Sequence, residues 1–133
     1  MTYQELKERQ QKEVNAFPFG FAFSAEQFAE MRKTLPLDEG DKYYSIGAGG
    51  FVRGKDIPAM REMFARHDKE MKELRKSEKE LENAFIREMG NHEYCITGDF
   101  EEIFRAVGID PKEATKNDVK IFNRAAKKYA KAC

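Results

Sequence analysis

The sequence predicts an α+β fold: one mostly helical domain over residues 1–133, with a small antiparallel sheet and a long helical hairpin. Three observations support this class. Apolar residues recur every three or four positions from Met60 onward, which is the period of an amphipathic helix. Aromatic and β-branched residues flank a glycine-rich turn at 47–50, which is typical of a β-hairpin. A chain of 133 residues with 41% hydrophobic residues is long enough for one core.

The first two helices are predicted from their caps. Thr2 with Glu5 forms a capping-box pattern that opens a polar helix ending at about Asn15. Ser24 with Gln27 opens a second helix, which runs from Ala25 to about Lys33 and stops before Pro36.

Four phenylalanines alternate between these helices, at Phe17, Phe19, Phe21 and Phe23. A period of two places the four rings on one face of an extended backbone, so the segment is a candidate strand. So much apolar surface must be covered either by the protein's own core or by a partner.

The clearest strand pair is 43–46 with 51–53, joined by Gly47-Ala48-Gly49-Gly50. The same segment resembles a phosphate-binding loop, because Gly49, Gly54 and Lys55 have its spacing. Asp56 stands where that loop needs a Ser or Thr hydroxyl for magnesium. The hairpin interpretation accounts for every residue and is preferred, with a weaker anion site at Arg53 and Lys55 as the alternative.

Asp56 is expected to cap a helix whose apolar seam is Met60, Phe64, His67, Met71 and Leu74. The seam continues through Glu78, Leu81, Phe85, Glu88 and His92. The segment is either one helix of over thirty residues or two helices that turn near Lys76 and Ser77, and the capping box of Ser77 with Glu80 favours the hairpin. Two further helices are predicted, from Asp99 to Gly108 and from about Asp118 to Ala132.

A hairpin at this turn would place His67 near Glu88 and His92, so that two histidines and a carboxylate could converge. This set is the candidate metal site of a metal-dependent hydrolase or nuclease. The more ordinary interpretation is a buried His–Glu hydrogen bond that ties the two helices together. No complete catalytic motif is present and no cofactor is indicated, so an enzyme is the less favoured class.

The last predicted helix is basic, which makes nucleic-acid binding a second alternative. The chain is neutral overall, with 24 basic and 24 acidic side chains, and it lacks the high pI of such modules. A solvated helix face is the competing interpretation. The candidate contacts are Lys120, Arg124, Lys127, Lys128 and Lys131.

The segments FPFGFAF (17–23), SIGAGGF (45–51) and NHEY (91–94) resemble those of a family of small uncharacterised proteins of Gram-positive phages and mobile elements. This resemblance implies a non-catalytic accessory protein that binds a host protein, such as a CRISPR or other defence nuclease. Suitable anchors near the hairpin are Tyr43, Tyr44, Phe51 and Arg53. We expect a cytoplasmic protein without a membrane partner, because no signal peptide or long apolar stretch is visible. The sequence leaves its oligomeric state open.

Overall fold

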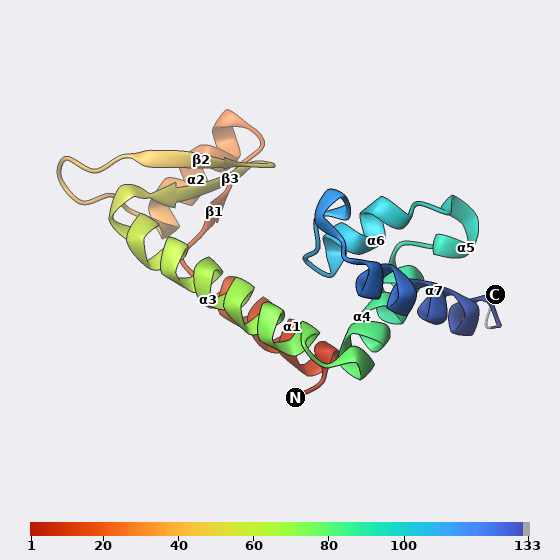
Figure 1. Ribbon diagram of the computed structural model, residues 1–133. Coiled ribbons are helices and arrows are strands. Elements are labelled where there is room, and N and C mark those ends of the chain that lie inside the picture. Colours follow the sequence, from red (N-terminus) through yellow and green to blue (C-terminus); the bar gives the residue numbers. More distant parts are fainter. Residues whose placement is uncertain (132–133) are drawn as a thin grey trace. The chain divides into compact units, whose positions relative to one another are not determined.

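The computed structural model describes residues 1–131 and confirms a mostly helical α+β fold with a small antiparallel sheet (Figure 1). The chain divides into two compact units. One unit is formed by residues 9–66, and the other by residues 1–8 together with the chain from residue 67 onward. The expectation of one domain over 1–133 is not tested by this division and stays a prediction.

The 9–66 unit holds a three-stranded sheet with the order β1-β3-β2. Gly20 lies opposite Phe51 and Phe21 opposite Gly50, while Tyr43 lies opposite Arg53. The expected hairpin is therefore present, and the Phe-rich segment supplies the third strand. The elements that begin in residues 1–66 are α1 (Tyr3–Ala16), β1 (Gly20–Phe21), α2 (Ala25–Thr34), β2 (Tyr43–Gly47), β3 (Gly50–Arg53), a 3-10 turn (Gly54–Asp56) and α3 (Ile57–Arg75).

Helix α2 packs on one face of this sheet through a glycine. A Cβ atom at Gly20 would lie 2.4 Å from Met31 Sδ and 3.2 Å from Leu35 Cδ2, so a larger residue there would require these side chains to move. The ring of Phe28 meets the rings of Tyr43 and Phe51 edge-on, with centroids 5.6 and 5.4 Å apart. Side chains that share a face with Gly20 are therefore turned toward α2.

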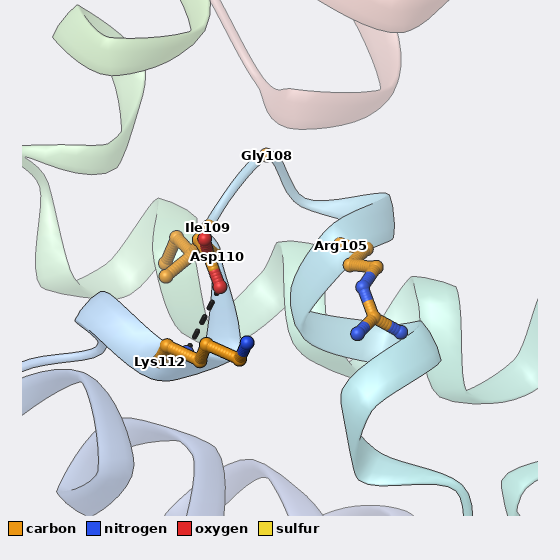
Figure 2. Close-up of a pocket in the computed structure, with 5 residues that line it drawn as sticks. All are labelled: Arg105, Gly108, Ile109, Asp110 and Lys112. Atoms are coloured by element: carbon orange, nitrogen blue, oxygen red, sulfur yellow. Dashed lines mark hydrogen bonds between the residues drawn. The ribbon is translucent and has the colours of Figure 1, made fainter.

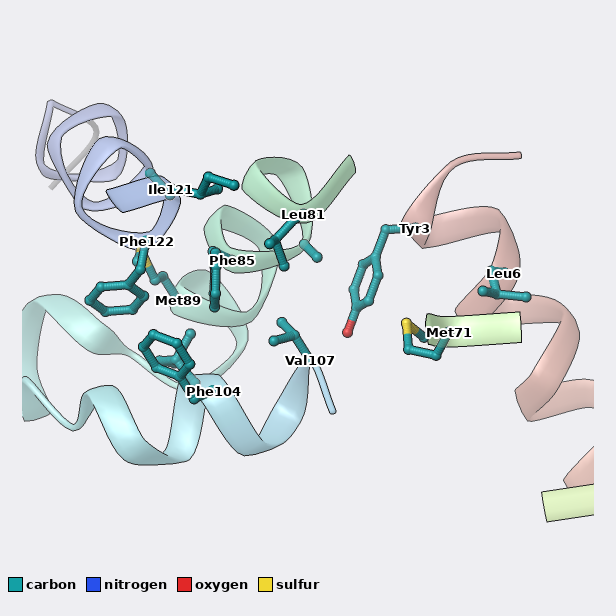
Figure 3. Packing of buried hydrophobic residues seen from close by; sticks show 13 residues of the cluster. Tyr3, Leu6, Met71, Leu81, Phe85, Met89, Phe104, Val107, Ile121 and Phe122 are labelled. Atoms are coloured by element: carbon teal, nitrogen blue, oxygen red, sulfur yellow. The ribbon is translucent and has the colours of Figure 1, made fainter. Parts of the chain in front are cut away.

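The other unit is helical and has its core around α4 (Figure 3). Phe85 of α4 lies against Phe104 and Phe122, with ring centroids 5.0 and 5.3 Å apart. Tyr3 and Leu6 at the start of α1 are buried in the same cluster. The elements after α3 are α4 (Glu78–Asn91), α5 (Tyr94–Thr97), α6 (Phe100–Ala106), a 3-10 turn (Pro111–Glu113) and α7 (Lys116–Ala130).

The predicted break between α3 and α4 is confirmed, because α3 ends at Arg75 and the Ser77 hydroxyl accepts a hydrogen bond from Glu80 N at 3.3 Å. The expected packing of the two helices is corrected. Helix α4 packs chiefly against α7 and then α6, rather than along α3, since its apolar side chains are taken up by the aromatic rings of those helices.

Two expected inward residues are also corrected. On α3 the buried positions are Met63, His67 and Met71, whereas Phe64 is partly exposed. On α7 the buried side chains are Ile121, Phe122 and Ala125, whereas Val119 is partly exposed. The helix begins at Lys116, capped by Thr115, and its expected end at Ala132 lies outside the described residues.

Candidate functional site

The turn of the β2–β3 hairpin depends on backbone conformations that glycine adopts easily. Gly47, Ala48 and Gly49 all have positive φ, at 88°, 50° and 76°. Positive φ at both central residues, Ala48 and Gly49, is the geometry of the two-residue turn whose twist matches antiparallel strands. Ala48 carries a Cβ in a region where it is unfavourable, so this turn stores some backbone strain.

Large apolar side chains pack directly on the glycines beside this turn. A Cβ at Gly49 would lie 2.4 Å from Phe23 Cε1, and one at Gly50 would lie 2.9 Å from Ile46 Cγ1. Phe21 is paired with Gly50 across the sheet, and Ala22 N donates to Gly49 O at 2.9 Å. The glycines thus hold three apolar side chains beside the hairpin turn.

These side chains are open to solvent despite their contacts with the turn. Phe21 and Phe23 are 62% and 76% exposed, and Ile46 is 44% exposed. Tyr44, which is 49% exposed, lies two residues before Ile46 on β2. We call Phe21, Phe23, Tyr44 and Ile46 the hairpin patch.

Three of the four predicted anchor residues already interact with other residues of the 9–66 unit. The hydroxyl of Tyr43 donates to Leu35 O, and the Tyr43 and Phe51 rings face Phe28. Arg53 Nε bonds Asp56 Oδ2 at 2.8 Å, and its Nη1 donates to Pro36 O at 3.0 Å. Tyr44 alone of the four is exposed.

The cationic side chains of the alternative anion site likewise interact with other side chains of the same unit. Besides the Arg53–Asp56 pair, Lys55 Nζ lies 3.0 Å from Asp38 Oδ2. Both cations of the proposed anion site therefore already have carboxylate partners, and the segment around them is the hairpin strand and 3-10 turn rather than a phosphate-cradling loop.

A chain of hydrogen-bonding groups surrounds Glu88 in the helical unit. Tyr3 Oη donates to Glu88 Oε1 at 2.9 Å, and Glu88 Oε2 lies 3.2 Å from His92 Nε2. The other imidazole nitrogen, Nδ1, lies 2.9 Å from Glu102 Oε1. Carboxylates only accept, so both contacts become hydrogen bonds when the imidazole is doubly protonated. The group joins α1, α4 and α6.

His67 is not part of this group. It is buried on α3, and no group of three His, Cys, Asp or Glu side chains suited to a metal ion is found within residues 1–131. The expected His–Glu bond exists as Glu88–His92 within α4, and the tie to a second helix is made by Glu102 of α6. Sequence spacing could not reveal Glu102, because its position depends on how α6 packs.

Burial shifts the pKa values of Tyr3 and of Arg75. The pKa of the Tyr3 hydroxyl is raised far above its usual range, mainly by burial and further by the Glu88 charge. Burial also lowers the pKa of the Arg75 guanidinium, whose Nη1 donates to Val107 O at 3.1 Å. Tyr3 therefore remains a neutral hydrogen-bond donor, which is a structural role.

Two of the five basic residues predicted to meet nucleic acid are tied to a buried carboxylate. Arg124 Nε and Lys128 Nζ lie 2.9 and 2.5 Å from the oxygens of Glu82, which is buried on α4. These contacts, with the hydrogen bond from Lys128 foremost, lower the pKa of the Glu82 carboxyl. Lys120, Lys127 and Lys131 are exposed.

A shallow pocket of about 390 Å³ lies after α6, lined by Arg105, Gly108, Ile109, Asp110 and Lys112 (Figure 2). Asp110 Oδ1 accepts from Lys112 N at 2.9 Å, and Arg105 Nη2 bonds Glu101 Oε2 at 3.1 Å. Charges of both signs therefore line or border it, and the pocket has no clear preference for an anion or a cation.

Comparison with known proteins adds one assignment. A family model described as a family of unknown function, DUF7659, matches residues 2–133. The chain belongs to the DUF7659 family. No curated protein and no solved structure matches it. Within the described residues, none of the helices combines the length and apolar character needed to span a membrane. Membership in DUF7659 supports the expected uncharacterised family and does not assign an activity.

Proposed function

We propose that this protein is a non-catalytic protein-binding module that engages its partner through the hairpin patch. The observation that carries the proposal is the exposure of Phe21 and Phe23, whereas Phe17 and Phe19 of the same stripe are less exposed. Phe17 and Phe19 are partly buried, with ring centroids 4.7 Å apart, and Phe19 stacks on Phe64. The stripe thus divides into an inner half and an outer half.

The outer half has properties expected of interface anchors. Aromatic side chains dominate the binding energy of protein interfaces, and each one fully buried contributes roughly 1.5–3 kcal/mol from the hydrophobic effect. The close contacts of Phe23 with Gly49 and of Ile46 with Gly50 restrict those side chains before binding. Such preorganisation lowers the entropy lost on association.

The finer proposal concerns the partner. The resemblance to proteins of Gram-positive phages supports a host protein as the partner, such as a CRISPR or other defence nuclease, in the cytoplasm. The hairpin patch would then replace the predicted set of Tyr43, Tyr44, Phe51 and Arg53, with Tyr44 common to both. Tyr43, Phe51 and Arg53 would act by holding the sheet that presents the patch.

Affinity capture from a nuclease-treated host lysate tests this proposal. The purified chain is used as bait beside Phe21→Ala and Phe23→Ala, and Ile96→Ala serves as a matched control because Ile96 is also a large exposed apolar side chain but belongs to the helical unit. We expect a stoichiometric partner whose affinity falls at least about tenfold for each hairpin variant and is unchanged for the control. A partner retained equally by all variants would contradict the proposed surface.

Nucleic-acid binding by α7 remains the second candidate, because Lys120, Lys127 and Lys131 are exposed and make no ion pair with the described residues. The engagement of Arg124 and Lys128 by Glu82 reduces the charge available to phosphates. This function would show affinity that falls steeply with salt and a shallower salt dependence after neutralisation of Lys120 and Lys127.

A further inference from the structure

The helical unit contains an apolar pocket of about 320 Å³ on the side of α7 away from Glu82. Its lining includes Tyr94 of α5, Phe100 and Phe104 of α6, and Val119, Phe122 and Asn123 of α7. The ring of Phe122 contacts those of Phe104 and Tyr94, with centroids 4.9 and 5.8 Å apart. The packed rings of Tyr94, Phe104 and Phe122 therefore line one side of the pocket.

The mouth of this pocket is open to solvent. Phe100 is 50% exposed and Val119 is 43% exposed, although both are large apolar side chains at its lining. Val119 was expected to face inward, and its exposure is explained by its place beside the pocket rather than in the core. Covering both side chains with an apolar group would remove this surface from water, which is favourable.

A stripe of lysines runs beside the mouth. Lys116, Lys120 and Lys127 share one side of α7 with Asn123, because positions 116, 120, 123 and 127 follow helical spacings of four, three and four. All three lysines are exposed, and none makes an ion pair with a residue described in the structure. The pocket is thus bordered by positive charge that is not neutralised within the described chain.

We propose that this pocket binds an acidic peptide segment by taking up one of its large apolar side chains while the lysine stripe meets its carboxylates. The volume is at the small end of ligand sites, which span roughly 300–1,000 Å³, and suits a side chain better than a cofactor. Aromatic rings dominate the lining, and the Asn123 amide offers hydrogen bonds for a peptide group. Opposite charge at the rim steers association and fixes register.

This site is independent of the hairpin patch, because the two share no residue and lie in different units. Either can therefore fail while the other holds. The variant Ile96→Ala, at an exposed apolar side chain that belongs to neither surface, is the matched control for both.

Fluorescence anisotropy of the full chain with short labelled peptides tests the proposal. The probes are acidic peptides with Phe, Leu, Ile, Met or Trp at the centre, their counterparts with central Ala, and neutral versions in which Asn and Gln replace Asp and Glu. A labelled single-stranded oligothymidine is included as a competing polyanion. We expect at least one acidic peptide to bind at least tenfold more tightly than both its alanine and its neutral counterparts.

Two variants locate the binding. Phe100→Ala is expected to weaken the best peptide at least tenfold, and Lys120→Gln with Lys127→Gln is expected to weaken it and flatten its salt dependence. Lys69→Gln with Lys72→Gln on α3 is the control for charge, and Ile96→Ala is the control for loss of an exposed apolar side chain outside the pocket. The proposal is overturned if no central side chain improves on alanine, if Phe100→Ala binds like the wild type, or if the oligonucleotide binds more tightly than every peptide.

Discussion

Replacing Tyr3 with phenylalanine removes one hydroxyl group from the core of the helical unit and leaves the ring in place. That hydroxyl donates to Glu88 Oε1 at 2.9 Å, and both side chains are buried, Tyr3 at 2% and Glu88 at 6% exposure. The variant therefore leaves a carboxylate oxygen without this donor in a site that excludes most water. A hydrogen bond to a charged group stabilises a protein by about 1.5–3 kcal/mol.

The expected loss of unfolding free energy is about 2 kcal/mol, because the cost of the missing donor is partly offset by no longer burying a hydroxyl. Urea denaturation measures this loss for the whole chain. Native-state hydrogen exchange of the α4 amides measures it for the helical unit itself. The control is Tyr44→Phe, whose hydroxyl makes no described hydrogen bond and whose side chain is half exposed, so a change within about 0.5 kcal/mol is expected.

A second variant separates the hydrogen bond from general packing. Glu88→Gln keeps the size of the side chain and removes its charge, and the double variant with Tyr3→Phe closes a thermodynamic cycle. We expect a coupling energy above about 0.5 kcal/mol between the two positions. Equal stabilities of Tyr3→Phe and Tyr44→Phe, or a coupling energy near zero, would refute the assigned role of the Tyr3 hydroxyl.

Three further predictions concern other parts of the chain. Gly49→Ala is expected to displace the Phe23 ring and to lower the unfolding free energy by about 1 kcal/mol, because alanine is unfavourable at the positive φ of this position. Unchanged NMR chemical shifts of Phe23 would contradict this prediction. The depressed pKa of Glu82 stabilises the fold fully above the unfolded glutamate value of roughly 4.3 and is lost as pH falls through the folded value. Glu82→Gln should therefore flatten the acid side of the stability–pH curve, and a parallel curve would speak against this linkage. Phe85→Ala is expected to lower the unfolding free energy of the helical unit by about 3–5 kcal/mol in denaturant titrations. A loss below about 1 kcal/mol would mean that neighbouring side chains fill the cavity, and would contradict a rigid core around Phe85.

The sequence allowed the helix starts to be predicted well because capping is local. The hydroxyls of Ser24 and Ser77 and the carboxylate of Asp99 each accept a hydrogen bond from the backbone N–H three residues ahead, as their patterns predict. The hairpin followed from glycines between aromatic runs for the same reason. Interactions between residues only a few positions apart can be recognised from the sequence alone.

The faces of the sheet could not be predicted, because they depend on how α2 packs. Alternation placed the Phe rings on one side of the strand, but the absence of a side chain at Gly20 allows α2 to approach the other side. Tyr43 and Phe51 share that side and meet Phe28, so an aromatic residue in a hairpin did not by itself indicate an anchor.

The predicted convergence of His67 with Glu88 and His92 is not found among residues 1–131, for a related reason. Its predicted geometry required α4 to lie along α3, whereas the aromatic side chains of α6 and α7 provide a larger apolar partner for α4. His92 therefore meets Glu102, which has no periodic relation to it in the sequence. Glu88 and His92 do lie together, because they are one helical turn apart.

The division of the helical unit into residues 1–8 and the chain from residue 67 bears on the order of folding. Tyr3 bonds Glu88 across 85 positions, so this core closes a long loop of chain. The loop is itself a compact unit whose two ends are joined, since Glu13 Oε1 accepts from Arg66 Nη1 at 3.2 Å. If residues 9–66 fold first, this bond brings the end of α1 close to Arg66, after which the rest of the helical unit follows in the chain. In that case part of the entropy cost of closing the loop is met before α4 forms.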